Sequence, residues 1–289
     1  MSRLRKKNNI INLQEFSFQT YLLITIALLV MILTILIVNI LLNGIDRLSF
    51  NLITNYPSSD VDKAGMRPAV IGSLYTVGVA ILIALPLGVA TGLYLHEYGA
   101  KNKINKLIEM SLVNLAGVPS VIFGLVALSF LSYTLGFGRS IIVGSIALAF
   151  LVLPLIVVAT IESARLVPSS HRLAAYALGA NKYQVVFRIV LPRIIPGALT
   201  SSILAVSRAL GEAAPILVIS GLVFIRRDPI SIFDEFTVMP LQIFNWISRP
   251  NQAFIELSAS AIIVLLMILI SLNVVAIYLR NKLQKRIAD

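Results

Sequence analysis

The chain contains six apolar stretches, each long enough to cross a lipid bilayer as a helix. They cover approximately residues 21–42, 69–95, 107–135, 140–161, 194–224 and 254–279. A hydrocarbon core about 30 Å thick needs roughly 20 residues of helix, and a helix satisfies its backbone hydrogen bonds within the lipid. The pattern therefore predicts an all-α integral membrane protein with six transmembrane helices.

Composition supports a place in the membrane. Hydrophobic residues make up 58% of the 289 residues, charged residues make up 13%, and the mean hydropathy is +0.91. That apolar content exceeds what a soluble domain of this length buries in one core. Cysteine is absent, which excludes a disulfide framework, a thiolate metal site and a catalytic thiol. The first stretch is too long for a signal-peptide core and has no small-x-small cleavage site, so we expect an uncleaved anchor.

Lysine and arginine are distributed unequally between the two sides of the predicted membrane. Sixteen of the 24 lie in the N-terminal tail, at 101–106, between Arg165 and Arg193, and at the C-terminus, whereas seven lie in the opposite loops. Because cytoplasmic loops are the more positive, both termini are expected in the cytoplasm. We expect basic cytoplasmic tails at 1–20 and 281–289 around a six-span domain, 21–280. The basic residues flank apolar spans instead of forming one stripe, so nucleic acid is not an expected partner.

The cytoplasmic loop at 162–193 carries the most specific pattern in the chain. It reads Leu173-Ala174-Ala175-Tyr176-Ala177-Leu178-Gly179 and, after nine residues, Ile189-Val190-Leu191-Pro192. Ser169 and Ser170 can cap a helix, and Gly179 permits the turn that ends it. A second short helix is expected from Lys182 to Pro192. Two short helices outside the lipid form a surface that a soluble partner could push or pull.

This loop resembles the EAA loop of ABC importer permeases, which reads E-A-A, three residues, G, nine residues, I-x-L-P. Six of the seven fixed letters match, and Leu173 stands where the family usually has Glu. The neighbouring Arg172 is available to compensate. The resemblance implies a type I importer permease of the MetI-like fold. It also implies that a nucleotide-binding subunit is contacted by Arg172, Leu173, Ala174, Ala175, Gly179, Ile189, Leu191 and Pro192.

Other runs resemble the PstA family of phosphate-importer permeases. They are Leu85-Pro86-Leu87-Gly88 through Tyr94-Leu95-His96-Glu97-Tyr98, Gly117 through Gly124, Arg208 through Pro215, and Pro240 through Trp246. The resemblance implies a second, homologous but different permease subunit, two copies of an ABC ATPase and an extracytoplasmic phosphate-binding protein in a prokaryotic cytoplasmic membrane. The sequence has no G-x-x-x-x-G-K-[ST] phosphate loop. We therefore expect no cofactor and no enzymatic activity here, with ATP and Mg²⁺ used by the partner ATPase.

Arg208 lies inside the fifth apolar stretch, and Glu212 follows four residues later. In a helix the two share a face and are expected to pair. Two interpretations stay open: a neutralised pair that fixes helix packing, or a guanidinium that binds phosphate oxygens two at a time while Glu212 tunes release. Ser73, Thr76, Ser120 and Ser129 are further candidates along the path, although such hydroxyls often bond their own backbone. Pro86, Pro119, Pro154 and Pro215 are expected to bend helices.

Other functions remain as alternatives. Within the importer class, the cargo could be another oxyanion, molybdate or sulfate. A channel without an ATPase would explain six spans and a buried arginine, but not the loop spacing. An intramembrane enzyme using Glu212 as an acid lacks a nucleophile or second carboxylate nearby. No metal site is expected from His96 and His171, since no carboxylate cluster joins them.

Overall fold

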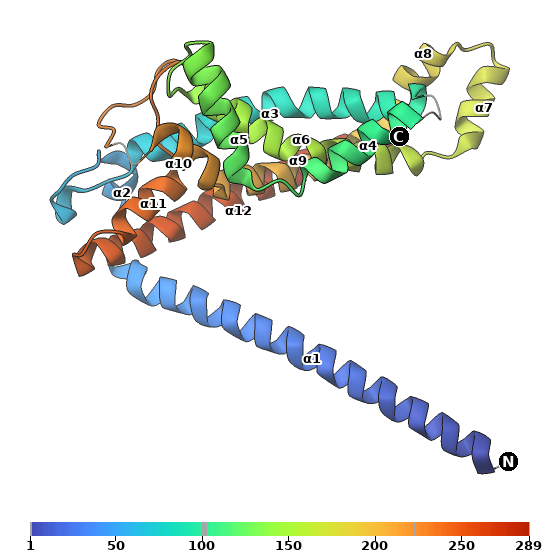
Figure 1. The fold of residues 1–289 in the computed structure, drawn as a ribbon, viewed down its shortest axis with the longest axis horizontal. Helices are drawn as coiled ribbons and strands as arrows, with labels where there is room; N and C mark the ends of the chain where they lie inside the picture. Colours follow the sequence, from blue (N-terminus) through green and yellow to red (C-terminus); the bar gives the residue numbers. More distant parts are fainter. Residues whose placement is uncertain (1, 100–102, 222–223, 289) are drawn as a thin grey trace.

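A computed structural model describes residues 2–99, 103–221 and 224–288 of the chain. Lys101, counted in the second basic loop, and residues 222–223, at the end of the fifth predicted stretch, lie outside the described residues. Within the described part, regular structure is helical, and the only bridge of β type joins Ser140 to Glu235. The long helices are α1 (Ser2–Gly44), α3 (Arg67–Leu93), α6 (Ile141–Arg165), α9 (Leu191–Gly211) and α12 (Gln252–Ala288) (Figure 1).

Five helical segments of the described chain are long and apolar enough to cross a membrane. They are Phe18–Arg47, Arg67–Tyr98, Ile141–Arg165, Lys182–Gly211 and Gln252–Lys282. The predicted stretches 21–42, 69–95 and 254–279 each lie within one of them, and 140–161 does so apart from its first residue. The helical membrane fold is therefore confirmed, and the differences concern the third and fifth predicted spans.

The third predicted span, 107–135, is two helices instead of one. Helix α4 (Lys103–Leu115) ends before a turn, and α5 (Ser120–Val126) begins after Pro119 and continues as the π-helical segment η4 (Ala127–Thr134). Pro119 has no N–H to donate, and the residue before a proline disfavours helix. Pro119 therefore lies at the start of a helix. The prediction that it bends a continuous helix is wrong.

The fifth predicted span, 194–224, is also interrupted. Helix α9 ends at Gly211, Glu212 is extended with φ −85° and ψ 116°, and α10 (Ala214–Ser220) has Pro215 in its first turn. Proline is well placed there because the first N–H groups of a helix have no partner within it. Gly221 ends α10 with φ +63°, so this predicted span is a long helix followed by a short one.

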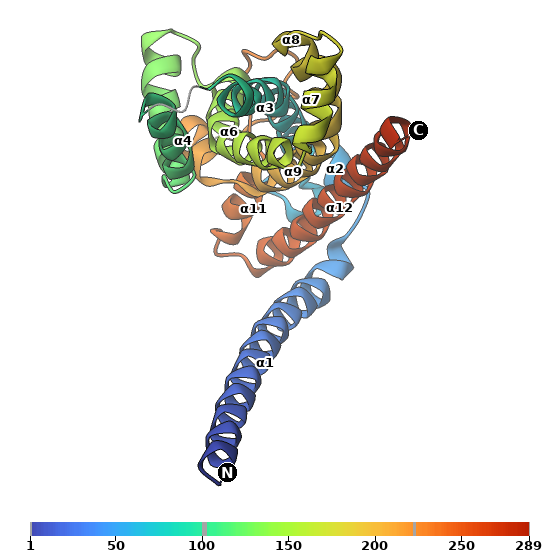
Figure 2. The same ribbon diagram turned by 90° about the vertical axis from the view of Figure 1, so that its right-hand side faces the viewer.

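Helices α3, α6 and α9 form the central bundle (Figure 2). Glycines on α3 allow its close approach to α6: an added Cβ would lie 2.7 Å from Ile156 at Gly88 and 2.7 Å from Thr160 at Gly92. Close approach lets α3 and α6 pack over their length, as is common between membrane helices. Pro86 and Pro154 lie inside these two helices.

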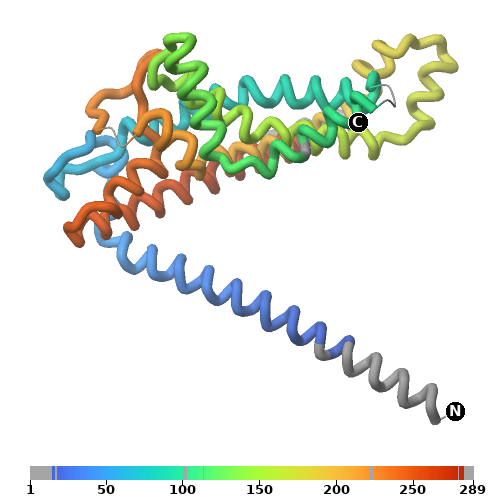
Figure 3. The backbone as a smooth tube through the Cα atoms, viewed as in Figure 1, coloured from blue at the N-terminus to red at the C-terminus, as the bar shows by residue number. Residues whose placement is uncertain are grey.

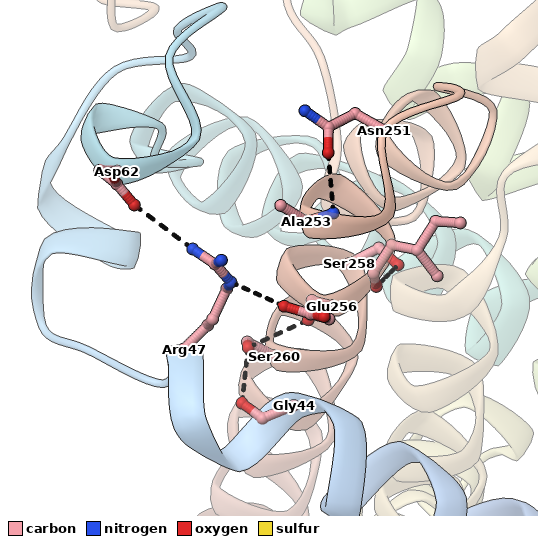
Figure 4. Close-up of polar contacts among 9 residues, drawn as sticks. Gly44, Arg47, Asp62, Asn251, Ala253, Glu256, Ser258 and Ser260 are labelled. Carbon is pink, nitrogen blue, oxygen red and sulfur yellow. Dashed lines mark hydrogen bonds and ion pairs between the residues drawn. The ribbon is translucent and has the colours of Figure 1, made fainter.

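Helix α1 leaves the bundle (Figures 1 and 3). Its side chains from Phe18 to Asn39 are exposed in the single chain where the structure describes them. Near its end it crosses α12, where Ser260 Oγ donates to the Gly44 carbonyl at 2.6 Å. Arg47, in the short segment η1 (Ile45–Arg47), pairs with Glu256 at 3.0 Å and with Asp62 at 3.4 Å (Figure 4). These polar contacts fix the point from which α1 departs.

The two ends of the molecule differ in structure. One end has α7 (Ser169–Ala177), α8 (Lys182–Val185) and both ends of the described chain (Figure 1). The other end has α2 (Asn51–Thr54), the short segment η2 (Val61–Lys63) and α11 (Met239–Ile247). The loops at 43–67 and 225–252 are therefore at the opposite end from the termini and the loop at 162–193.

Candidate functional site

The segment 162–193, here called the coupling loop, begins with the last residues of α6. Its first complete helix is α7, which has no buried residue. Its N-cap position is Pro168, and no side chain caps it, so Ser169 and Ser170 are its first residues and the predicted serine cap is wrong. The predicted turn at Gly179 is confirmed. Gly179 has φ +82°, and the N–H of Ala180 donates to the Ala175 carbonyl at 3.1 Å, as in a glycine-terminated helix.

The second helix of the coupling loop starts with a capping box. Asn181 and Gln184 each accept the other's backbone N–H at 2.9 Å, which satisfies two otherwise unpaired donors. The predicted end at Pro192 is wrong, because α8 continues through the π-helical segment η5 (Val186–Val190) into α9. A π-turn widens the backbone locally, and Pro192 lies in the first turn of α9. Lys182 to Gly211 is thus one helical segment.

The residues expected to contact a partner fall into two groups. Leu173, Ala174 and Gly179 are exposed, as is Leu178, at 90%. The other group is half-buried and comprises Ala175, Ile189, Leu191 and Pro192. Of these, Ala175, Ile189 and Leu191 pack against a buried cluster where α3 and α6 end and α9 begins. The exposed group forms an apolar surface outside the membrane-spanning segments, of the kind that binds another protein.

Arg172 does not take the place of the glutamate that Leu173 replaces. Its guanidinium turns into the molecule and donates to Glu97 Oε1 at 2.7 Å, to the Val167 carbonyl at 2.6 Å and to the Ala164 carbonyl at 3.0 Å. The side chain of Leu173 is 65% exposed. The expected compensation is therefore wrong, because the charge of Arg172 is used inside the chain.

Glu97 was not among the predicted site residues. It lies in the π-helical segment η3 (Tyr94–Tyr98), which continues α3. A carboxylate at the end of an apolar stretch needs a charged or hydrogen-bonding partner, and that was the available signal. Its partner, 75 positions later along the chain, could not be named from local pattern.

The predicted pair between Arg208 and Glu212 is not formed. Since α9 ends at Gly211, Glu212 leaves the helical face of Arg208. Instead, the Ser120 hydroxyl donates to Glu212 Oε1 at 2.9 Å. Arg208 is exposed in the single chain, and within the described residues no carboxylate lies at ion-pair distance from it.

The two helix breaks lie together. The hydrogen bond between Ser120 and Glu212 joins the start of α5 to the residues before α10. Gly124 lies against Pro215, and an added Cβ at Gly124 would lie 2.6 Å from the Pro215 carbonyl oxygen. The structure thus brings Ser120, Glu212 and the last turn of α9 to one place in the apolar part of the chain.

The other hydroxyl candidates lie elsewhere. Ser73 is buried and accepts the N–H of Met239, the first residue of α11, at 2.8 Å. Thr76 is buried, and its hydroxyl has no hydrogen-bond partner within the described chain. Ser129 is exposed on η4. The structure does not bring Ser73 or Thr76 into contact with Glu212, and their role along a path stays a prediction.

The loops at 43–67 and 225–252 contact one another. Asp228 pairs with Arg67 at 2.6 Å and accepts a hydrogen bond from the Tyr56 hydroxyl at 3.1 Å. In the same region the backbone N–H groups of Ile230 and Ser231 each donate to Asp234 at 2.8 Å, and this holds the pKa of the Asp234 carboxyl below its ordinary value. No group of three His, Asp or Glu side chains is placed for a metal ion in the described part of the chain.

Comparison with known proteins identifies the class of the chain. A family described as the binding-protein-dependent transport system inner membrane component matches residues 64–289. The chain belongs to this family. It is therefore a multi-pass membrane transport component, as the long apolar helices indicate.

Curated relatives of this inner membrane component cover most of the chain. The probable ABC transporter permease protein YqgI of Bacillus subtilis is 31% identical over 81% of this chain and 84% of its own length. The phosphate transport system permease protein PstA 1 of Mycobacterium tuberculosis is 35% identical over 75% of this chain and 70% of its own length. The phosphate transport system permease protein PstA of Xylella fastidiosa is 31% identical over 83% of this chain and 84% of its own length.

Solved structures confirm the fold. A chain of the bacterial alginate ABC transporter, in complex with an alginate-pentasaccharide-bound periplasmic protein, superposes with a TM-score of 0.68 at 13% identity over 91% of this chain and 93% of that chain. A chain of the inward-facing MetNI methionine ABC transporter superposes with a TM-score of 0.57 at 16% identity, over 75% of this chain and 97% of that chain. The type I, MetI-like permease fold is thus that of this inner membrane component.

Proposed function

We propose that this chain is the transmembrane permease subunit of an ATP-driven phosphate importer in a prokaryotic cytoplasmic membrane. The main structural support for the transport mechanism is the continuous helix from Lys182 to Gly211. It connects the exposed apolar surface of the coupling loop to the break where Ser120 meets Glu212. The phosphate transport permeases among the relatives support phosphate as the cargo.

The partners follow from what the chain has and lacks. Since its sequence contains no P-loop, ATP and Mg²⁺ are bound by a separate ATPase, present in two copies, which docks on the surface of Leu173, Ala174, Leu178 and Gly179. The coupling loop and both termini then lie in the cytoplasm, the side that the distribution of lysine and arginine favours. A second, homologous permease subunit completes the path, and an extracytoplasmic binding protein delivers phosphate to the outer loops. The ATP state then shifts the subunits between inward-facing and outward-facing arrangements.

Arg208 is the proposed phosphate contact. It projects from the last turn of α9 and is exposed in the single chain. Its planar fork of donors matches phosphate oxygens. Glu212, held by Ser120 at 2.9 Å, leaves that fork free for an anion and limits by repulsion how tightly the anion is retained.

The test is uptake and ATP hydrolysis measured together in vesicles that contain the assembled complex and its binding protein. Phosphate should stimulate both activities, and sulfate and molybdate should stimulate neither. If molybdate or sulfate stimulated both activities and phosphate did not, the cargo would be that other oxyanion. Anion flux that persists without the ATPase subunits would indicate a channel and contradict the proposal.

A further inference from the structure

The inner end of α3 is held by both helices of the coupling loop. Arg172, in α7, donates to Glu97 Oε1 at 2.7 Å. Lys182, at the start of α8, lies with Nζ 4.8 Å from the ring centroid of Tyr98, within the range of a cation–π attraction. Glu97 and Tyr98 belong to the same five-residue segment, η3, so the whole coupling loop is attached to α3 at one place.

The contact between Arg172 and Glu97 is enclosed. Their side chains are 17% and 9% exposed. Arg172 also donates to the carbonyl of Ala164, in the last turn of α6, and to that of Val167, just after α6. Removing one member of a buried ion pair is costly because it leaves the other charge without a partner. A displacement of α7 therefore displaces η3 with it.

A neighbouring ion pair shows the contrast. Arg165 contacts Glu109 at 3.2 Å and Glu162 at 2.7 Å, but the side chains of Arg165 and Glu109 are 52% and 43% exposed. Exposed pairs contribute little, because water competes for both charges. The pair also joins α4 to α6 and involves no residue of α7 or α8. It is a matched control at the same end of the molecule.

Helix α3 leads from this joint to the outer end. There, the Ser73 hydroxyl accepts a hydrogen bond from the N–H of Met239 at 2.8 Å. This hydrogen bond connects α3 to the start of α11. Gly72 lies against the backbone of Thr237, which precedes α11. Rigid helices and packed side chains of this kind can couple two distant sites when both sites shift the equilibrium between the same two conformations.

We propose that Arg172 and Glu97 are positioning residues that transmit movement of the coupling loop to α3, in parallel with the continuous helix from α8 into α9. This inference rests on the proposed function. When the ATPase moves α7, the ion pair displaces the inner end of α3, and α3 carries the movement to α11. Without the pair, the ATPase still docks on the exposed apolar surface, but α3 follows the movement of α7 less closely.

The experiment compares Glu97→Gln, Arg172→Gln and the double variant with Glu109→Gln, in vesicles with the complete complex and phosphate-loaded binding protein. Co-purification of the ATPase should be unchanged in all four. In both single variants, phosphate taken up per ATP hydrolysed should fall by about two- to thirtyfold, the range for residues that couple two sites. The double variant should lose no more than either single one, and Glu109→Gln should retain the wild-type ratio.

A reversible cross-link tests the joint in a single preparation. The sequence has no cysteine, so Glu97→Cys with Arg172→Cys gives one defined pair for a short, reducible bifunctional thiol reagent. Cross-linking should restore the coupling ratio, and reduction should lose it again. The two single-cysteine variants, treated identically, control for reaction with other subunits. This arm decides the matter if the glutamine variants assemble poorly.

A wild-type coupling ratio in assembled Glu97→Gln would overturn the inference, as would losses that multiply in the double variant. A cross-linked pair that couples no better than the reduced pair would overturn it as well. These outcomes differ from failure of the proposed function, in which the wild-type complex itself takes up no phosphate in response to ATP.

Discussion

Arg208 is the charged side chain whose surroundings most directly concern transport. A guanidinium within an apolar helix is costly unless it finds a partner, another subunit or a water-filled cavity. In this chain Glu212 has turned away to Ser120, and Arg208 is exposed. Its charge is therefore available to a ligand instead of being neutralised within its own helix.

The first prediction concerns that charge. Arg208→Ala should reduce phosphate uptake by at least tenfold, because a good charge-assisted contact contributes about 1.5–3 kcal/mol. Arg208→Lys keeps the charge without the planar fork and should have an intermediate rate. Uptake in vesicles measures the effect, and ATPase co-purification confirms assembly. Wild-type uptake by assembled Arg208→Ala would refute the role.

The second prediction concerns the contact that holds Glu212. Ser120→Ala removes the hydroxyl that donates to Glu212 Oε1 and should lower stability by about 1–2 kcal/mol, as for a half-buried hydrogen bond to a charged group. Thermal unfolding of the purified complex measures this loss. Ser129→Ala is the control, since Ser129 is exposed and follows in the same helical segment, Ser120–Thr134. Equal melting temperatures would show that the hydrogen bond contributes nothing.

Individual residues of the site were partly predictable from the sequence. Gly179 was predicted as a turn because a helix commonly ends at a glycine with positive φ, and it has φ +82°. The pairing of Arg172 with Glu97, and of Ser120 with Glu212, depends on tertiary packing across 75 and 92 positions. A local charge pattern favoured Arg172 near Leu173 and Glu212 near Arg208, and the packing overrode both.

At the scale of elements, hydropathy located the helices but not their interruptions. The third predicted span contains Gly117-Val118-Pro119 and the fifth contains Gly211-Glu212-Ala213. Each break is too short, and its surroundings too apolar, to lower the average over a window of about 19 residues. The prolines carried the missing information, because Pro119 and Pro215 lie where helices start. Proline is stable at a helix start and disruptive within a helix.

The third prediction belongs to the turn between α7 and α8. Gly179→Asp should leave the membrane helices folded but uncouple ATP hydrolysis from uptake, because it strains a backbone with φ +82° and adds a charge to the exposed docking surface. An added Cβ meets nothing within 4 Å, so no clash contributes. Gly179→Ala imposes the strain without the charge and separates the two causes. Equal coupling ratios in Gly179→Asp and wild type would refute the docking role of this turn.

At the scale of the whole molecule, two helices lead away from the coupling loop. Helix α9 continues directly from α8 and η5 to the break beside Glu212, and α3 runs from the joint at Glu97 to the contact of Ser73 with α11. Because α3 and α6 pack closely at Gly88 and Gly92, we expect α3 and α6 to move together. Helix α1 is different: it is exposed along its apolar length and crosses α12 at Gly44 (Figure 1).

That crossing gives the last prediction. A Cβ added at Gly44 would lie 2.7 Å from the backbone of Ala259 and Ser260, and backbone cannot move aside as the end of a side chain can. Gly44→Val should therefore separate α1 from α12 and destabilise the complex by about 1–3 kcal/mol, as overpacking does. The control is Gly78→Val, in α3, where an added Cβ meets nothing within 4 Å. Thermal unfolding of the two purified complexes measures the difference, and cross-linking of α1 to α12 reports the crossing. If both valine variants melt and cross-link alike, the close approach at Gly44 does not set the position of α1.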